Sequence, residues 1–136
     1  MKIAKTPAYF ELLMAKSCDA NLVDMWLATH YDADDNDIAN HISFTERKEI
    51  FFWLLECALK SGQLRLMNKG EYLTGTPEEL VQQFREVFPR SNFPFPDDPE
   101  LDAGYWFYGI GKPEVPGEAV WRYEHPDGRV QWMPCP

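Results

Sequence analysis

The aspartate run that begins at Asp32 has the spacing that most resembles a metal-binding motif. Counted from Asp32, the first, third and fifth positions of a calcium loop are Asp32, Asp34 and Asn36, which all have oxygen-bearing side chains. Such a loop also needs glycine at its sixth position and glutamate at its twelfth, where this sequence has Asp37 and Ser43. The run is therefore interpreted as an acidic surface and not as a calcium site.

Histidines, cysteines and glycines form no other chemical motif. His30 and His41 have no cysteine or third histidine near enough to complete a zinc-binding pattern. The segment 109–112 has two glycines and a lysine, but Pro113 follows it and no helix start is evident, as a phosphate loop would require. No serine lies in a nucleophile-elbow context. We therefore expect no enzymatic activity, no bound metal and no cofactor.

Helical signals fill the part of the chain before Pro89. Apolar residues at helical spacing predict a helix over 7–16 and a second helix that begins near Leu22 and ends near the aspartate run 32–37. A third helix is predicted to begin at Ser43-Phe44-Thr45-Glu46, a capping box in which the serine and the glutamate bond each other's free backbone N–H groups, and to end at Gly62. A fourth is predicted from the cap Thr76 to the stop at Pro89.

Strand signals dominate the rest. Leu64, Leu66 and Leu73 predict short strands around a turn at 68–70. The aromatic run 105–108 predicts a strand covered on both faces, which is a better interpretation than a platform for nucleic-acid bases. Apolar alternation predicts two more strands, on either side of a turn at 125–128. The expected fold is therefore a single α+β domain spanning 1–136, with N-terminal helices packed on a small C-terminal antiparallel β-sheet.

Charge limits the classes of partner. The 136 residues include 22 acidic and 13 basic side chains, a net charge of −9. Binding to nucleic acid or to an anionic membrane through the general surface would require the opposite sign. No apolar run is long enough to span a bilayer, the N-terminus is too polar for a signal peptide, and the three cysteines are far apart. We expect a cytoplasmic protein.

The acidic residues concentrate in two segments that contain no lysine or arginine. From Ser17 to Ile42 there are six acids, and from Asn92 to Asp102, within a proline-rich loop spanning 90–104, there are four more. Solubility alone explains such segments in many proteins, and that alternative stays open. The predicted partner-binding residues are Asp32, Asp34, Asp35, Asp37, Asp97, Asp98, Glu100 and Asp102.

Five short sequences carry a family resemblance: Phe44-Thr45-Glu46-Arg47, Gly62-Gln63-Leu64-Arg65-Leu66, Gly75-Thr76-Pro77-Glu78-Glu79, Trp106-Phe107 and Val120-Trp121. Through them, roughly over residues 43–133, the chain resembles a family of small uncharacterised proteobacterial proteins that is similar to immunity proteins of contact-dependent growth inhibition systems. The resemblance offers no catalytic residues. It implies a cytoplasmic protein that binds and neutralises a basic toxin domain, such as a nuclease. The alternatives are a regulatory or adaptor binding protein and, third, an enzyme whose site residues meet only in three dimensions.

Overall fold

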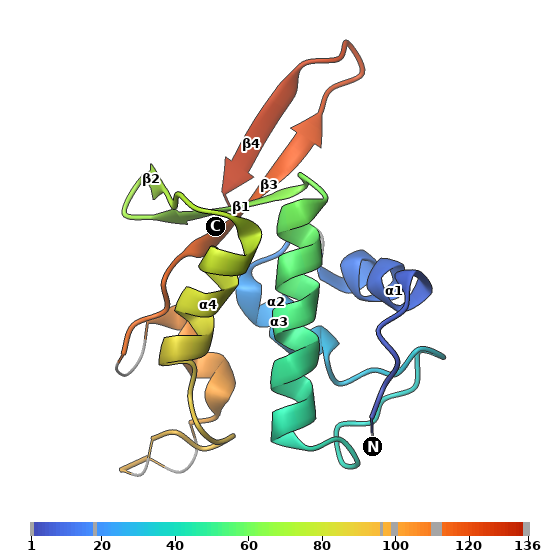
Figure 1. Ribbon diagram of the computed structural model, residues 1–136, viewed down its shortest axis with the longest axis vertical. Coiled ribbons are helices and arrows are strands. Elements are labelled where there is room, and N and C mark those ends of the chain that lie inside the picture. The colour runs from blue at the N-terminus through green and yellow to red at the C-terminus, as the bar shows by residue number, and fades with distance from the viewer. Residues whose placement is uncertain (1, 18, 96, 99–100, 110–112, 135–136) are drawn as a thin grey trace.

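The computed structural model describes the whole chain except residues 1, 18, 96, 99–100, 110–112 and 135–136. Helices come first along the chain, and most of the strands come last (Figure 1). The helices are α1 (Pro7–Ser17), α2 (Leu22–Ala28), α3 (Phe44–Lys60), α4 (Pro77–Val87) and the 3-10 helix η1 (Ala103–Tyr108). The strands are β1 (Leu64–Asn68), β2 (Glu71–Tyr72), β3 (Glu118–Glu124) and β4 (Val130–Pro134). The α+β prediction is confirmed.

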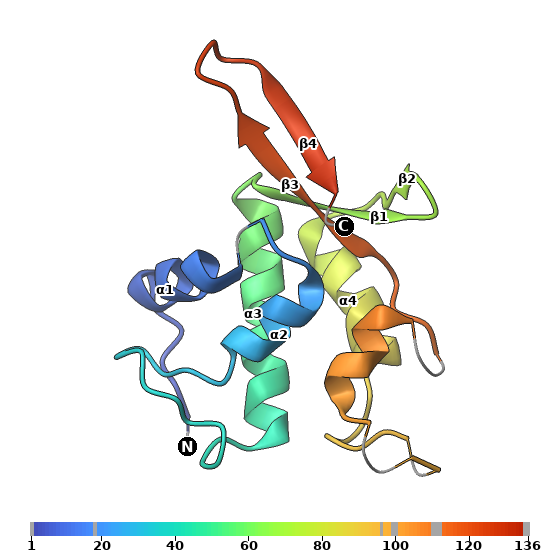
Figure 2. The ribbon, with the colours of Figure 1, turned by 180° about the vertical axis from the view of Figure 1, so that it is seen from behind.

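Helix α3 runs through the middle of the molecule, with α1 on one side of it, α4 on the other, and α2 lying across the face of α3 that Figure 2 turns towards the viewer (Figures 1 and 2). Its N-terminal cap forms only half of the predicted capping box. Ser43 Oγ accepts a hydrogen bond from Glu46 N at 3.1 Å, but the Glu46 carboxylate accepts one from Ile3 N, also at 3.1 Å. The glutamate therefore ties the N-terminal segment to α3 instead of closing the box. At the other end, Gly62 takes the predicted left-handed conformation, with φ +78°.

An aromatic cluster fills the core between these helices. Trp26 of α2, Phe51 of α3 and Phe88, just beyond α4, pack with ring centroids 5.3–6.0 Å apart, and Phe107 of η1 joins them. All four side chains are at least nine-tenths buried. Burial of such rings is among the largest stabilising contributions in a domain of this size. The cluster therefore fixes α2, α3 and η1 relative to one another.

The sheet is antiparallel, with strand order β2-β1-β3-β4. Leu66 and Trp121 lie on the face toward the helices, and both are only 1% exposed. The Trp121 indole N–H donates to the carbonyl of Ala20, at the entrance to α2, which anchors the sheet on the helices. The β3–β4 hairpin projects beyond the helices (Figures 1 and 2).

The predicted strand at 105–108 is wrong, because these residues belong to η1. Asp102 caps the helix by accepting a hydrogen bond from Gly104 N at 2.8 Å. Residues three apart eclipse in a 3-10 helix. The exposed Tyr105 and Tyr108 are three apart, whereas the adjacent residues Trp106 and Phe107 are both buried. A strand would point Trp106 and Phe107 to opposite faces of a sheet. Four aromatic residues in a row are compatible with a strand covered on both faces and also with the 3-10 helix. The cap at Asp102 is the feature that distinguishes the two.

Candidate partner-binding site

The carboxylates of the first acidic segment are largely used to build its own turn. Asp32 Oδ1 accepts hydrogen bonds from the backbone N–H groups of Asp34 and Asn36, both at 2.9 Å. Asp37 Oδ1 likewise accepts one from Ala39 N at 2.9 Å. These are the local side-chain-to-backbone bonds that aspartate makes in turns.

Lysine also reaches this segment. Lys16 Nζ lies 2.7 Å from Asp35 Oδ1 and 3.9 Å from the centroid of the Tyr31 ring. The sequence analysis found no base in the segment, but α1 supplies this one from outside it. The segment is thus partly neutralised in the folded protein, and Asp34 is an exposed carboxylate for which the structure describes no such bond.

Two pKa shifts report the local electrostatics. The N–H of Asn36 is the main group that lowers the pKa of Asp32, because it stabilises the carboxylate; the N–H of Asp34 adds to it. Burial, with a further contribution from the negative charge of Asp32, raises the pKa of Tyr9 to about 12. The Tyr9 hydroxyl donates to the carbonyl of Tyr31 at 2.6 Å, so α1 holds the start of the acidic segment in place.

The second acidic segment lies on the opposite side of α2 and α3, at the same end of the molecule (Figures 1 and 2). Asp97 and Asp98 are exposed there, and Asp102 is occupied in capping η1. Glu100 lies outside the described residues. The structure therefore does not bring the predicted binding residues into one surface but separates them into two.

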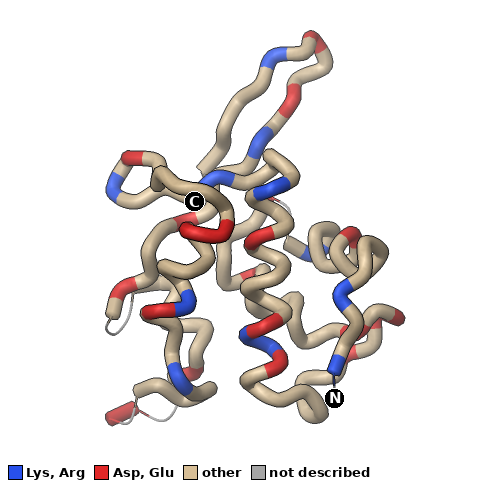
Figure 3. Tube along the Cα trace, in the orientation of Figure 1, with Lys and Arg blue, Asp and Glu red and all other residues tan. Residues whose placement is uncertain are grey.

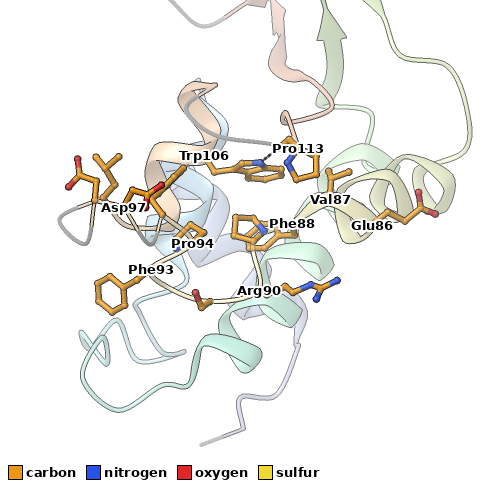
Figure 4. Close-up of a pocket in the computed structure, with 14 residues that line it drawn as sticks. Glu86, Val87, Phe88, Arg90, Phe93, Pro94, Asp97, Trp106 and Pro113 are labelled. Atoms are coloured by element: carbon orange, nitrogen blue, oxygen red, sulfur yellow. Dashed lines mark hydrogen bonds between the residues drawn. The ribbon is translucent and has the colours of Figure 1, made fainter.

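A pocket of about 730 Å³ lies beside this second segment (Figure 4). Phe88 and Trp106 pack together at its base, with ring centroids 5.0 Å apart, and Pro94 also lines it. The Trp106 indole N–H donates to the carbonyl of Pro113 at 2.6 Å. Phe93 lies at its edge and is 65% exposed. The remaining residues that line it include Glu86, Val87, Arg90, Asp97, Asp98 and Leu101.

Carboxylates flank this apolar pocket. Asp97 and Glu86 lie at opposite sides of it in Figure 4, with Arg90 as the described basic residue that lines it. Large exposed rings surrounded by charged groups are typical of protein-binding surfaces, in which aromatic side chains act as anchors and the charged rim directs the approach. Sequence analysis identified Asp97 and Asp98, but it missed Phe93 and Trp106 because three separate segments form the pocket.

Arg47 is a buried charge that the sequence did not single out as special. Its side chain stacks on Trp26, with 3.9 Å between the guanidinium carbon and the ring centroid. Its Nε donates to Thr29 Oγ1 at 3.0 Å and its Nη2 to the Trp26 carbonyl at 3.1 Å. Burial lowers the pKa of Arg47 to about 10. These contacts all join α3 to α2, so we assign Arg47 a structural role.

Among the described residues, no group of three or more His, Cys, Asp or Glu side chains is placed to hold a metal ion. In the same part of the chain, no helix is long and apolar enough to cross a bilayer.

Comparison with known proteins places the chain in a family. Residues 59–133, more than half of the sequence, match the family described as protein of unknown function DUF596. The chain belongs to this family. The matched region contains the pocket, the second acidic segment and nearly all of the sheet, but it does not include the first acidic segment.

A solved structure has the same fold. It is an uncharacterized protein conserved in bacteria, from Neisseria meningitidis, with 28% sequence identity and a TM-score of 0.65. The match covers 91% of this chain and 88% of the other. No curated protein matches the sequence. Helices α1 and α2 and most of α3 lie outside the family match, and the 91% coverage means that most of residues 1–58 are nevertheless shared with that bacterial protein.

Proposed function

We propose that this protein is a cytoplasmic immunity protein that binds a basic toxin domain and thereby neutralises it. The resemblance noted in the sequence and the net charge of −9 support this proposal. An acidic inhibitor is attracted to a basic substrate-binding cleft over a distance, which speeds the encounter and disfavours acidic partners.

The observation that carries the proposal is the pocket between α4 and η1. Its exposed Phe93 offers an anchor for a partner, and its carboxylates, Glu86 and Asp97, offer complementarity to lysine or arginine. The first acidic segment is the weaker candidate, because Asp32 and Asp37 already bond to backbone N–H groups and Asp35 to Lys16. We therefore propose the pocket and the second acidic segment as the centre of the interface.

The experiment starts by co-purifying the protein with the product of the toxin gene expected next to its own. Association of the two purified proteins is then followed by stopped-flow fluorescence at low and at high ionic strength. The double variant Glu86→Gln/Asp97→Asn should associate several-fold more slowly at low ionic strength, and its rate should depend less on salt. Phe93→Ser should mainly speed dissociation, because an anchor acts after the encounter.

The double variant Glu11→Gln/Asp34→Asn is the matched control. It removes the same two charges from exposed positions on the other side of the molecule, so it should alter the association rate much less. Equal effects of the two double variants would show that only total charge matters and that the pocket is not the centre of the interface. If no toxin is encoded beside the gene and none co-purifies, the immunity function is rejected, and a regulatory or adaptor role takes its place.

A further inference from the structure

The end of the β3–β4 hairpin has no third strand beside it. Strand β1 pairs with β3 only from Glu118 to Trp121, whereas β3 and β4 remain paired as far as Glu124 and Val130. Apart from the hydrogen bond that Arg122 N donates to the Gln63 carbonyl at 2.8 Å, residues 122–132, here called the arm, form a two-stranded ribbon that projects beyond the helices (Figures 1 and 2). An isolated two-stranded hairpin is only marginally stable in water, so such a ribbon gains from a surface that covers it.

One face of the arm is already partly covered within the chain. The guanidinium carbon of Arg65 lies 3.9 Å from the centroid of the Trp132 ring and 5.2 Å from that of Tyr72. Val120, on the same face, is only 1% exposed. This stacking across β2, β1 and β4 fixes the base of the arm.

The other face continues the core face of the sheet into solvent. Trp121 is 1% exposed, but its cross-strand partner Met133 is 46% exposed, and Tyr123, two residues further along the same face, is 44% exposed. The ring of His125 packs edge-on against Tyr123, and its Nε2 lies 2.9 Å from Gln131 Oε1. This apolar face is thus held in shape before any partner arrives, which lowers the entropic cost of binding.

Charge indicates what covers this face. The sheet and its turns, residues 63–75 and 118–134, contain four acidic and four basic residues, so the whole net charge of −9 belongs to the rest of the molecule. On the arm, Arg122 pairs with Glu124 at 3.3 Å and Arg129 with Asp127 at 2.9 Å, and Figure 3 shows both signs side by side there. A basic partner gains nothing from such a surface. Two copies of this acidic chain repel each other least where they meet through it.

We propose that the protein self-associates through its arm, with the face of Tyr123 and Met133 packed on the same face of a second copy about a twofold axis. A twofold interface presents the same patch from both sides, which suits an apolar, charge-balanced face. Pairing through the open edge of β4 is disfavoured, because Pro134 at its end has no N–H to donate. The arm is short, so the contact falls in the small class, below about 1,200 Å² of buried surface, and the dimer is weak.

Sedimentation velocity of the full chain, from low to high micromolar concentration, tests the proposal. Wild type should change from monomer to dimer over this range. The variant Tyr123→Ser/Met133→Ser should raise the dissociation constant at least about tenfold, which corresponds to about 1.4 kcal/mol. Leu27→Ser is the matched control: Leu27 is as exposed as Met133, at 46%, but lies on α2, so the dimer should keep its wild-type strength.

Arg129→Glu tests the charge balance directly. It gives each arm an excess of negative charge, so the dimer should weaken at low ionic strength and recover at high ionic strength. The proposal is overturned if wild type stays monomeric throughout, or if Leu27→Ser weakens the dimer as much as the arm variant does. It is also overturned if the arm variant leaves the dimer unchanged and instead weakens binding of the basic toxin domain, because the arm would then belong to that interface.

Discussion

The two acidic segments look alike in sequence and differ in the folded protein. In the first, the carboxylates of Asp32 and Asp37 accept backbone hydrogen bonds, and Asp35 is paired with Lys16. In the second, Asp97 is exposed beside a pocket lined by Phe88 and Trp106. One segment uses its charges to hold a turn, whereas the other combines charge with exposed aromatic surface.

A run of acidic residues can therefore have either of two roles, one in the fold and one in binding. An aspartate carboxylate readily accepts hydrogen bonds from backbone N–H groups two to four residues further along the chain, and such bonds give it a structural role. A carboxylate becomes a good candidate for binding when an anchor side chain lies beside it, as Phe93 does for the second segment. Each of the following predictions tests one side of this comparison.

The largest effect is expected at the base of the pocket. Trp106 is 2% exposed, and its ring centroid lies 5.0 Å from that of Phe88. Trp106→Ala removes this packing and the hydrogen bond to Pro113, so it should lower the free energy of unfolding by about 3–5 kcal/mol. Denaturant unfolding measures this loss.

Phe93→Ala, at the exposed edge of the same pocket, is the control and should change the free energy of unfolding by no more than about 0.5 kcal/mol. Similar losses in both variants would mean that Phe93 is structural and is not available as an anchor.

A smaller effect is expected where α1 holds the first segment. Tyr9→Phe removes the hydrogen bond to the Tyr31 carbonyl and should lower the free energy of unfolding by about 1 kcal/mol at neutral pH. The folded pKa of about 12 lies above the ordinary value of 10.0, so the neutral phenol stabilises the fold fully below pH 10.0. That stabilisation is lost as the pH rises from 10.0 towards 12, so the advantage of wild type over Tyr9→Phe should shrink and disappear within this range.

Alkaline difference spectra provide the direct measurement. One tyrosine of wild type, missing from Tyr9→Phe, should ionise only near pH 12. If the tyrosine that is missing from Tyr9→Phe is instead one that ionises near pH 10.0 in wild type, Tyr9 is neither buried nor bonded as described.

Local signals in the sequence were sufficient for most of the helices. The cap at Thr76 forms both bonds of the capping box, and α4 begins there as predicted. The box at Ser43 formed only half, because Ile3, forty-three residues away, competes for Glu46. The sequence contains no local signal for such a long-range contact. The same reason explains why Lys16 was not expected as the partner of Asp35.

The proposed binding site was harder to predict from the sequence than the fold. The pocket needs Phe88 after α4, Phe93 in the loop and Trp106 in η1, and their meeting depends on tertiary packing. The prediction of a strand at 105–108 placed Trp106 in a sheet and therefore did not indicate its position in the pocket. The sequence does not mark Arg47 as a buried residue, because its stacking on Trp26 exists only in the folded state.

The smallest predicted effect isolates the charge of Asp32. In Asp32→Asn the amide oxygen can still accept hydrogen bonds, but the negative charge that the N–H groups of Asn36 and Asp34 stabilise is gone.

These bonds depress the folded pKa of Asp32 below the ordinary value of 3.8. The carboxylate therefore stabilises the fold above that value, and this stabilisation is lost as the pH falls through the lower, folded pKa. Thermal unfolding should show a Tm for Asp32→Asn that lies slightly below wild type at neutral pH and equals it in strong acid. Asp97→Asn removes one exposed charge from the second segment, at a position for which no such side-chain-to-backbone bond is described, so it controls for the change in net charge. If both variants lose stability at neutral pH and both recover in acid, the carboxylates of the two segments play the same structural role, and the distinction between them fails.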